Sequence, residues 1–350
     1  MDIKKGNNFM NKNILVTGAA GFIGFHLCKK LLIQGSKVIG IDNINDYYDT
    51  TLKEKRLENL SNSYLKNNNW LFIKADIENK KDLQDIFQQH KPKIIINLAA
   101  QAGVRYSIEN PEAYINSNIV GFQNILDCSK SIGVKHLLYA SSSSVYGGNT
   151  NTPFSELDSV NHPVSIYAAT KRANELFAHT YSHLYKIPIT GMRFFTVYGP
   201  WGRPDMAPMI FADSIYSKKP IKVFNFGKMS RSFTYIDDVI YSIQKLTENP
   251  ALVDKNFDKK NPNPATSWCP HRIFNIGTNK AVGLEEFISL LEEEIGIKAI
   301  REYTDMQLGD VKNTLADNQM LKDWIGETPE TPLSNGIAKF ISWYKEYINK

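Results

Sequence analysis

The sequence predicts an α/β protein built on a doubly wound parallel sheet, and three features indicate this. Short, unbroken apolar runs alternate with amphipathic stretches from residue 13 onward, and a glycine-rich turn follows the first run. The chain has 350 residues, 42% of them hydrophobic. At roughly 150 residues per domain, that length and composition suggest two domains with buried cores. Strands with both faces covered by helices have this pattern, because each strand is buried on both sides.

The apolar runs are the predicted strands, and the amphipathic stretches between them are the predicted helices. Strands are expected at 13–17, 37–41, 70–73, 94–97, 136–140 and 192–195, and helices at 22–33, 83–89, 112–131 and 164–185. Beyond residue 195 prolines are frequent and the pattern loosens, with strands expected near 221–224 and 273–276 and helices near 284–294 and 336–349. We therefore predict a first domain at 12–195, rejoined by some later segments, and a smaller mixed α/β lobe at 196–350. The polar, proline-rich stretch 254–270 is expected to be an exposed loop.

Composition argues against several classes of protein. The chain has 41 Lys or Arg and 36 Asp or Glu, a formal charge of +5, without the basic clusters typical of nucleic-acid binding. Residues 53–56 are charged but few, and a solvated helix face is expected there. No stretch approaches the ~20 apolar residues of a membrane span, so we expect a cytoplasmic protein without a membrane partner. Three cysteines, Cys28, Cys128 and Cys269, lack metal-ligand spacing and are expected to be core thiols, with no bound metal.

The glycine-rich turn indicates a dinucleotide site. Gly18, Gly21 and Gly24 lie between the first strand and the first helix, which begins with Phe22 and Ile23. Glycines there let the backbone approach a pyrophosphate, and the helix N-terminus offers free N–H groups. Asp42 ends the second strand, where a carboxylate can accept hydrogen bonds from the adenosine ribose and would repel a 2′-phosphate. NAD is therefore favoured over NADP.

Two further strand ends fit the same interpretation. Asp76 and Ile77 follow the third strand, beside the expected adenine, and Leu98, Ala99 and Ala100 follow the fourth with side chains suited to backing a cofactor. A glycine turn, a helix cap and ordinary strand ends are the alternatives for each feature alone. Together, in this order, they predict a Rossmann-like NAD-binding domain at 12–195.

A tyrosine and a lysine on one predicted helix suggest the chemistry. Tyr167 and Lys171 are spaced i, i+4, so they project from one face about 6 Å apart along the axis. A nearby ammonium is expected to lower the pKa of the phenol and make it a usable general base. A serine run, Ser141 to Ser144, follows the fifth strand at the ligand-binding edge of the sheet. A surface Tyr/Lys pair and a serine-rich turn are the alternatives when either motif stands alone.

With these motifs in place, the chain resembles the extended short-chain dehydrogenases/reductases that act on nucleotide sugars, over about residues 12 to 345. Within that branch it is most similar to the UDP-glucuronate 4-epimerase subfamily. The resemblance rests on Gln101-Ala-Gly-Val-Arg-Tyr-Ser107, Ser141-Ser-Ser-Ser-Val-Tyr-Gly147, Tyr167-Ala-Ala-Thr-Lys-Arg-Ala-Asn-Glu175 and Arg193-Phe-Phe-Thr-Val-Tyr-Gly-Pro-Trp-Gly-Arg-Pro-Asp-Met206. Two shorter motifs, Arg231-Ser-Phe-Thr-Tyr-Ile-Asp-Asp238 and Met306-Gln-Leu-Gly-Asp-Val311, are shared more widely among UDP-sugar epimerases and their close relatives.

The resemblance implies roles for individual residues. Ser142 matches the catalytic hydroxyl, Tyr167 the general base and Lys171 the residue that binds the nicotinamide ribose. Arg231 matches the arginine that grips the pyrophosphate, and Asp310 the residue near the uridine ribose. This chain carries Thr196 and Gln307 where galactose-type epimerases carry Asn and Arg, which fits the acid-sugar subfamily but puts the phosphate contacts in doubt.

The serine run also bears on the reaction. Relatives that dehydrate or decarboxylate the sugar carry acids at the positions of Ser143 and Ser144, and serine cannot perform that acid/base work. What is left is oxidation at C4 and re-reduction on either face, which is epimerisation with tightly bound NAD.

A uronate substrate also needs its carboxylate held, because a 4-keto uronate can lose carbon dioxide. Candidate substrate-binding donors are Ser142, Ser143, Thr196, Arg193 and Arg105, and Arg203 is a further candidate within the last long motif. Arg193 could equally form a buried structural ion pair.

Two other functions stay open at this point. The chain could epimerise another UDP-hexose, such as UDP-glucose or an N-acetylhexosamine or its uronate, or it could be a non-catalytic dinucleotide-binding regulator. Relatives pair the helices at 112–131 and 164–185 between subunits, so a homodimer is expected, and the family implies a place in polysaccharide precursor synthesis.

Overall fold

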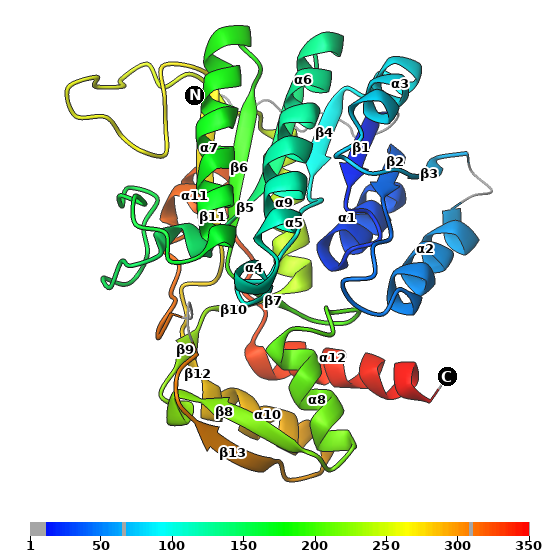
Figure 1. Cartoon of the computed structure of the whole chain (residues 1–350), viewed down its shortest axis with the longest axis vertical. Coiled ribbons are helices and arrows are strands. Elements are labelled where there is room, and N and C mark those ends of the chain that lie inside the picture. The colour runs from blue at the N-terminus through cyan, green and yellow to red at the C-terminus, as the bar shows by residue number, and fades with distance from the viewer. Residues whose placement is uncertain (1–11, 65–67, 308–310, 350) are drawn as a thin grey trace.

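The computed structural model describes residues 12–64, 68–307 and 311–349. Within these ranges a seven-stranded sheet has the order β11-β6-β5-β4-β1-β2-β3, and every neighbouring pair is parallel. Helices cover both faces (Figure 1), which confirms the doubly wound α/β fold. The strands are β1 (Asn13–Thr17), β2 (Lys37–Asp42), β3 (Trp70–Lys74), β4 (Ile94–Asn97), β5 (His136–Ser142), β6 (Ile189–Phe194) and β11 (His271–Ile276).

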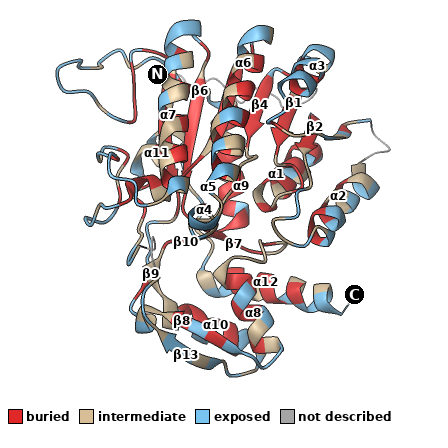
Figure 2. Ribbon diagram, in the orientation of Figure 1, coloured by how far each residue is buried: buried red, intermediate tan, exposed pale blue. Residues whose placement is uncertain are grey.

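Alternating side chains of each strand pack against opposite helical layers. In β1, Ile14 and Val16 belong to one hydrophobic cluster and Leu15 to the other. The first cluster includes residues of α1 (Phe22–Ile33), α2 (Thr51–Tyr64) and α9 (Ile236–Glu248), and the second includes residues of α3 (Lys80–His90), α6 (Phe122–Ile132) and α7 (Ile166–Tyr185). Figure 2 shows the strands as a buried layer between half-exposed helices. Burial on both faces explains why the strands are continuous apolar runs.

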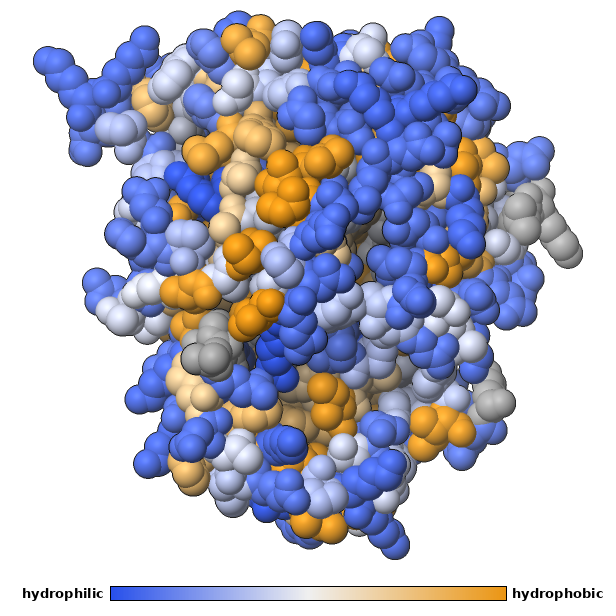
Figure 3. Space-filling model, in the orientation of Figure 1, coloured by the Kyte–Doolittle hydropathy of each residue, from blue (hydrophilic) through white to orange (hydrophobic). Residues whose placement is uncertain are grey.

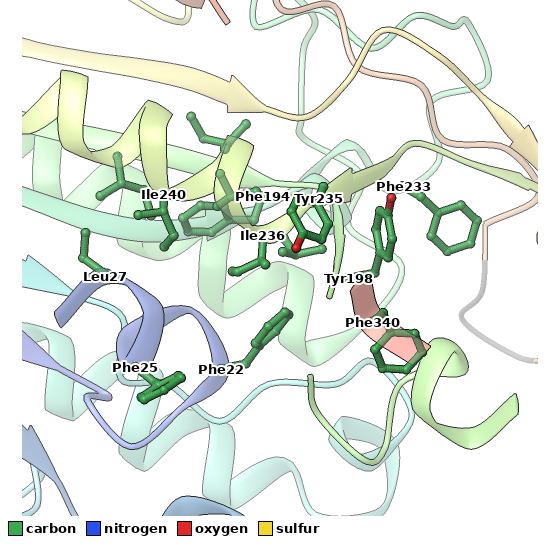
Figure 4. Packing of buried hydrophobic residues seen from close by; sticks show 14 of the residues in the cluster. Phe22, Phe25, Leu27, Phe194, Tyr198, Phe233, Tyr235, Ile236, Ile240 and Phe340 are labelled. Carbon is green, nitrogen blue, oxygen red and sulfur yellow. The ribbon is translucent and has the colours of Figure 1, made fainter. Parts of the chain in front are cut away.

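The first cluster continues from the sheet into a smaller lobe. Figure 4 shows Phe22 and Ile236 beside the sheet, followed by Tyr198, Phe233 and Phe340 on the way into that lobe. Its elements are β7 (Thr196–Tyr198), α8 (Ala207–Tyr216), β8 (Pro220–Phe224), β9 (Ser230–Arg231), β10 (Phe233–Tyr235), β12 (Val282–Gly283), α10 (Leu284–Ile295), β13 (Ile300–Thr304) and α12 (Leu333–Ile348). Because this first cluster is continuous, apolar packing joins the two lobes directly.

Not all of the chain beyond residue 195 belongs to the smaller lobe. Strand β11 pairs with β6, α9 packs against α1, and α11 (Gln319–Ile325) contacts β11. The stretch 254–270 contains neither helix nor strand. Within the described ranges, no helix combines the length and the apolarity that crossing a bilayer requires.

The helix expected at 112–131 is interrupted. Two short helices, α4 (Tyr106–Glu109) and α5 (Pro111–Tyr114), are followed by a π-helical stretch at Ile115–Gly121 and only then by α6. Asn118 lies in the π-helical stretch, and its side chain accepts from Gln101 N at 2.8 Å and donates to Gln101 O at 3.0 Å. Its carbonyl accepts from the Asn174 side chain at 2.6 Å. The π-helical stretch has a wider turn than an α-helix, and there the Asn118 side chain forms a buried link to Gln101 in the loop after β4.

The expectation of a solvated face at residues 53–56 is wrong for two of its side chains. Lys53 is 5% exposed and Arg56 is fully buried. Arg56 donates to the carbonyls of Ala20, Trp201 and Gly202, so it joins the glycine turn to a segment far away in sequence. The sequence does not indicate that Arg56 is buried, because its acceptors are backbone carbonyls and every residue carries one. The three cysteines are buried and free, as expected.

Candidate active site

A cavity of about 1140 Å³ lies at the carboxyl ends of the strands, and residues of both lobes line it. The glycine turn and the ends of β2 to β5 contribute one side, and β8, β9, β12 and α8 contribute the other. Open parallel sheets bind ligands at this edge, where the strand order reverses on either side of β1. The described residues contain no group of three or more side chains placed to hold a metal ion.

The glycine turn packs too tightly for larger residues. Gly18 has a φ of +70°, which L-residues rarely adopt, and a Cβ added at Gly24 would lie 2.0 Å from the Gly18 carbonyl oxygen. Gly21 donates its N–H to the same carbonyl at 3.0 Å. Gly18, Gly21, Phe22, Ile23 and Gly24 all line the cavity at the start of α1. The backbone is thus available for close approach by a phosphate.

Asp42 lies beside this turn at the end of β2. One carboxylate oxygen accepts from Ala20 N at 3.0 Å and the other from Ile44 N at 2.9 Å. Burial raises the pKa of Asp42, while the Ile44 N–H and the charge of Lys53 oppose that rise. A carboxylate has about four acceptor positions, so two remain for a ligand's hydroxyl groups. Asp76, Ile77, Leu98, Ala99 and Ala100 line the same part of the cavity, and together these residues fit a dinucleotide.

Ser142, Tyr167 and Lys171 meet on the cavity wall. Ser142 ends β5, while Tyr167 and Lys171 lie one turn apart on α7, which the Ser165 side chain caps by accepting from Ala168 N. The Lys171 Nζ donates to the Ala140 carbonyl at 2.9 Å and lies 5.9 Å from the centre of the Tyr167 ring. The structure therefore brings the three predicted catalytic residues together.

The electrostatics of this group differ from the expectation. Burial raises the pKa of Tyr167, opposed by a hydrogen bond with Ser142 and by the charge of Arg203. Burial also lowers the pKa of Lys171 to about 7, which weakens it as a fixed positive charge. The sequence predicted that Lys171 would lower the pKa of Tyr167 toward neutrality; among the residues of this chain burial prevails instead, and the net shift is upward.

The prediction that Arg193 binds substrate is wrong. Arg193 and Glu175 are both fully buried and form a two-point ion pair, with Nε–Oε1 at 2.8 Å and Nη2–Oε2 at 3.0 Å. The third nitrogen, Nη1, donates to the Tyr146 hydroxyl at 3.0 Å, and Arg193 does not line the cavity. Glu175 also accepts from Ser141, the neighbour of Ser142, at 2.7 Å. Arg193 thus stabilises the end of β5 through Glu175, without reaching the cavity.

The other predicted substrate residues, apart from Asp310, line the cavity. Arg105, Ser142, Ser143, Thr196, Arg203 and Arg231 all line the cavity. The guanidinium of Arg105 lies 5.0 Å over the ring of Phe224, and Arg231 donates to the Ser230 and Lys312 carbonyls. Asp310 lies outside the described residues.

Sequence reasoning missed several lining residues. Tyr47, Lys53 and Asp205 line the cavity near Arg203, and Phe224 lines it from the smaller lobe. The paired tyrosines after Asp42 and the acid two residues after Arg203 were visible signals, but nothing in the sequence indicates that these segments meet.

The chain is similar to known proteins over nearly its whole length. The model of the NAD dependent epimerase/dehydratase family matches residues 14–277. Protein CapI of Staphylococcus aureus is 52% identical over 96% of this chain and 99% of its own length. A probable UDP-glucuronate 4-epimerase of Rhizobium meliloti is 44% identical, over 95% of this chain and 96% of its own. The crystal structure of UDP-glucuronic acid 4-epimerase from Bacillus cereus, in complex with UDP-glucuronic acid and NAD, superimposes with a TM-score of 0.83 at 33% identity, covering 95% and 99% of the two chains.

Proposed function

The chain belongs to the NAD dependent epimerase/dehydratase family, and we propose that it is a 4-epimerase interconverting UDP-glucuronate and UDP-galacturonate through a 4-keto sugar. The observation that carries this proposal is the pairing of Ser142, Tyr167 and Lys171 with Ser143 and Ser144 on one cavity wall. Those two serines cannot remove a C5 proton or protonate a leaving hydroxyl. The group suited to proton transfer beside Ser142 is then Tyr167, which serves oxidation and re-reduction at C4.

Each residue has a definite task in this cycle. Tyr167 accepts the proton of the C4 hydroxyl and returns it after the sugar has turned over, while Ser142 hydrogen-bonds the same oxygen. The cofactor is NAD, which supplies a hydride acceptor and donor and, when oxidised, a positive charge that favours the phenolate. Lys171 would hold the nicotinamide ribose, and its contact with the Ala140 carbonyl keeps it close to Tyr167. Gly18, Gly21 and Gly24 would hold the pyrophosphate of NAD, and Asp42 the adenosine ribose.

The sugar has to be held loosely and its nucleotide firmly, because the 4-keto sugar must turn over so that hydride can return to either face of its ketone. We propose that residues 12–195 mainly bind NAD and residues 196–350 mainly bind the UDP sugar. Arg231 would grip the pyrophosphate of the substrate, and Asp310, outside the described residues, would contact the uridine ribose. Binding energy placed on UDP leaves the ring free to rotate.

Two cavity residues suit a sugar acid better than a neutral hexose. Arg203 lines the same cavity as Tyr167, where its charge opposes the rise of the Tyr167 pKa, and Thr196 offers a hydroxyl from the start of β7. A cation there would hold the uronate carboxylate and discourage loss of carbon dioxide from the 4-keto acid. Arg105 is a further candidate for the acid or the phosphates.

The alternative substrate is another UDP-hexose, and a solved UDP-glucose 4-epimerase of Thermotoga maritima is similar to this chain at 29% identity with a TM-score of 0.82. Turnover of UDP-glucuronate and UDP-glucose by the same preparation separates the two. We expect kcat/KM for the uronate to exceed that for the hexose by about tenfold or more, as expected for one desolvated charge pair. Comparable values, or a preference for UDP-glucose, would favour the alternative.

The non-catalytic alternative is tested with Tyr167→Phe. This variant should keep UDP binding within about twofold and lose turnover by about 10³-fold, since general base catalysis typically contributes 10²–10⁴-fold. Tyr241→Phe, whose hydroxyl contacts Glu327 at the surface, is the matched control. An unchanged rate in Tyr167→Phe would remove the tyrosine from the mechanism.

We further propose a cytoplasmic homodimer that serves polysaccharide precursor synthesis. Exposed apolar side chains lie on the π-helical stretch before α6 and on α7: Ile115, Val120, Ile166, Leu176, Leu184 and Tyr185. Figure 3 shows apolar surface in the part of the view where Figure 1 draws α6 and α7. A second copy packing its own α6 and α7 there would cover them. Sedimentation at monomer mass over a micromolar concentration series would argue against the dimer.

A further inference from the structure

Arg203 is held by Asp205, which stands two residues further along the chain. Its Nε donates to one oxygen of Asp205 at 3.0 Å, and its Nη2 donates to the other oxygen. Both side chains are about a quarter exposed and both residues line the cavity. A guanidinium has five N–H donors, so this side-on pair uses two and leaves three for another acceptor.

Asp205 is held in turn by Tyr47. The Tyr47 hydroxyl donates to Asp205 at 3.1 Å, and the Tyr47 ring lies under the Arg203 guanidinium with 6.0 Å between the ring centre and Cζ. Tyr47 belongs to the loop between β2 and α2, which begins directly after Asp42. The arginine is therefore fixed by a chain of contacts that starts in the NAD-binding half of the molecule.

The backbone on the other side of Arg203 is fastened to the same half. Buried Arg56 donates to the Trp201 carbonyl at 2.6 Å and to the Gly202 carbonyl at 3.2 Å. Trp201 has a φ of +62°, in the left-handed region that non-glycine residues seldom adopt, so this turn needs support from its neighbours. The segment 201–205 is thus held through its backbone by Arg56 and through its side chains by Tyr47.

We propose that Asp205, held by Tyr47, is a positioning residue that fixes the Arg203 guanidinium against the carboxylate of the sugar acid. This inference rests on the proposed function. When the C4 hydroxyl lies at Tyr167, the carboxylate is attached to the adjacent ring carbon, and Arg203 is a cation that lines the same cavity as Tyr167. An unpaired arginine side chain has four flexible torsions, and fixing it beforehand removes the entropy that substrate binding would otherwise cost.

The positioning matters most after oxidation. A 4-keto uronate loses carbon dioxide when the C5–C6 bond to its carboxylate swings perpendicular to the plane of the C4 ketone. The electron pair of that bond then forms an enolate at C4–C5, which takes up a proton, and the hydride held by NADH can reduce the resulting 4-keto pentose to a UDP-pentose. A guanidinium held in place keeps the carboxylate in one orientation, whereas a mobile one lets it turn. Release of Arg203 should therefore weaken binding of the uronate and increase the share of turnovers that end in a UDP-pentose.

The test uses Asp205→Asn and Tyr47→Phe, each with a control outside the site. Asp205→Asn keeps the shape of the side chain and removes its charge; Asp49→Asn, in the same loop region but exposed and bonded to Thr51, is its control. Tyr47→Phe removes one hydroxyl and keeps the ring, and Tyr241→Phe is its control. The measured quantities are kcat and KM for UDP-glucuronate, the UDP-pentose fraction, and Ki for UDP.

We expect a larger effect from Asp205→Asn than from Tyr47→Phe. Asp205→Asn should raise KM and the UDP-pentose fraction each by about tenfold, and Tyr47→Phe should raise them by about fivefold, the factor for one hydrogen bond. Ki for UDP should stay within about twofold, and both controls should match the wild type. In an Arg203→Met background Asp205→Asn should add less than about twofold, because the two residues act as one unit.

Three results would overturn the inference alone while the wild type still converts UDP-glucuronate. They are unchanged KM and product ratio in both variants, a rise of Ki for UDP in step with KM, and a full additive effect of Asp205→Asn in the Arg203→Met background. If Asp205→Asn does not fold, Tyr47→Phe decides by the same criteria. If the wild type leaves UDP-glucuronate unchanged, the proposed function fails and the inference fails with it.

Discussion

The role of Arg193 can be tested by replacing it with methionine. Arg193 and Glu175 are both fully buried, and removing the arginine leaves the carboxylate with Ser141 and Arg172 as partners. Loss of one partner of a buried pair costs about 3–5 kcal/mol, because the other charge stays desolvated and under-compensated. We expect Arg193→Met to lower the free energy of unfolding by that amount, as measured by urea denaturation at pH 7.5.

The same carboxylate provides a matched control. Arg172 contacts Glu175 at 3.0 Å but its side chain is 24% exposed, so Arg172→Met should cost about 1 kcal/mol or less. The activity of folded Arg193→Met, measured well below its unfolding midpoint, should show KM for UDP-glucuronate within about threefold of the wild type, since the arginine does not line the cavity. A variant as stable as the wild type with a strongly raised KM would restore Arg193 to the substrate site and refute this reasoning.

Three further predictions concern the cofactor, pH and the uronate. Gly24→Ala places a Cβ 2.0 Å from the Gly18 carbonyl oxygen, so the purified protein should lose its NAD, read by absorbance after denaturation, whereas Gly283→Ala, with nothing within 4 Å, should retain it. Burial raises the pKa of Glu156 to about 7. The contribution of Glu156 to the free energy of unfolding is therefore full below its unfolded pKa near 4.5 and is lost as pH rises to 7. In urea denaturation, Glu156→Gln should reduce the fall of that free energy between these pH values by about 2–3 kcal/mol. Thr196→Val should raise KM for UDP-glucuronate or yield pentose by-product, and if chromatography and kinetics show neither, Thr196 does not contact the acid.

Contradicting outcomes are clear for the first two of these. NAD retained by Gly24→Ala at the wild-type level would mean that the turn can relax, and that its tightness does not govern cofactor binding. A slope of stability against pH that is the same in Glu156→Gln and the wild type would show that folding does not change the pKa of Glu156.

The sheet and the position of the glycine turn at its edge were predictable because they depend on local patterns. The runs at Ile14 and Ile94 are apolar on both faces, and the turn at Gly18 to Gly24 follows a strand directly, so spacing alone fixes their place at the sheet edge. Tyr167 and Lys171 were predictable for the same reason, since helical periodicity puts them on one face.

The parts that could not be predicted depend on contacts between distant segments. Arg193 was ambiguous because its partner, Glu175, becomes visible only when α7 packs on β6. Arg56 was assigned to solvent because its acceptors are carbonyls about 36 and 145 residues away. The interruption at Asn118 depends on a loop carbonyl and on Asn174, neither of which periodicity can indicate.

The most direct test is to incubate the purified protein with UDP-glucuronate, without added NAD, and to resolve the products by chromatography and NMR of the anomeric proton. We expect UDP-galacturonate, formed with the NAD that copurifies. No conversion even after NAD is added would contradict the uronate assignment, and a UDP-pentose as the main product would contradict the interpretation of Ser143 and Ser144.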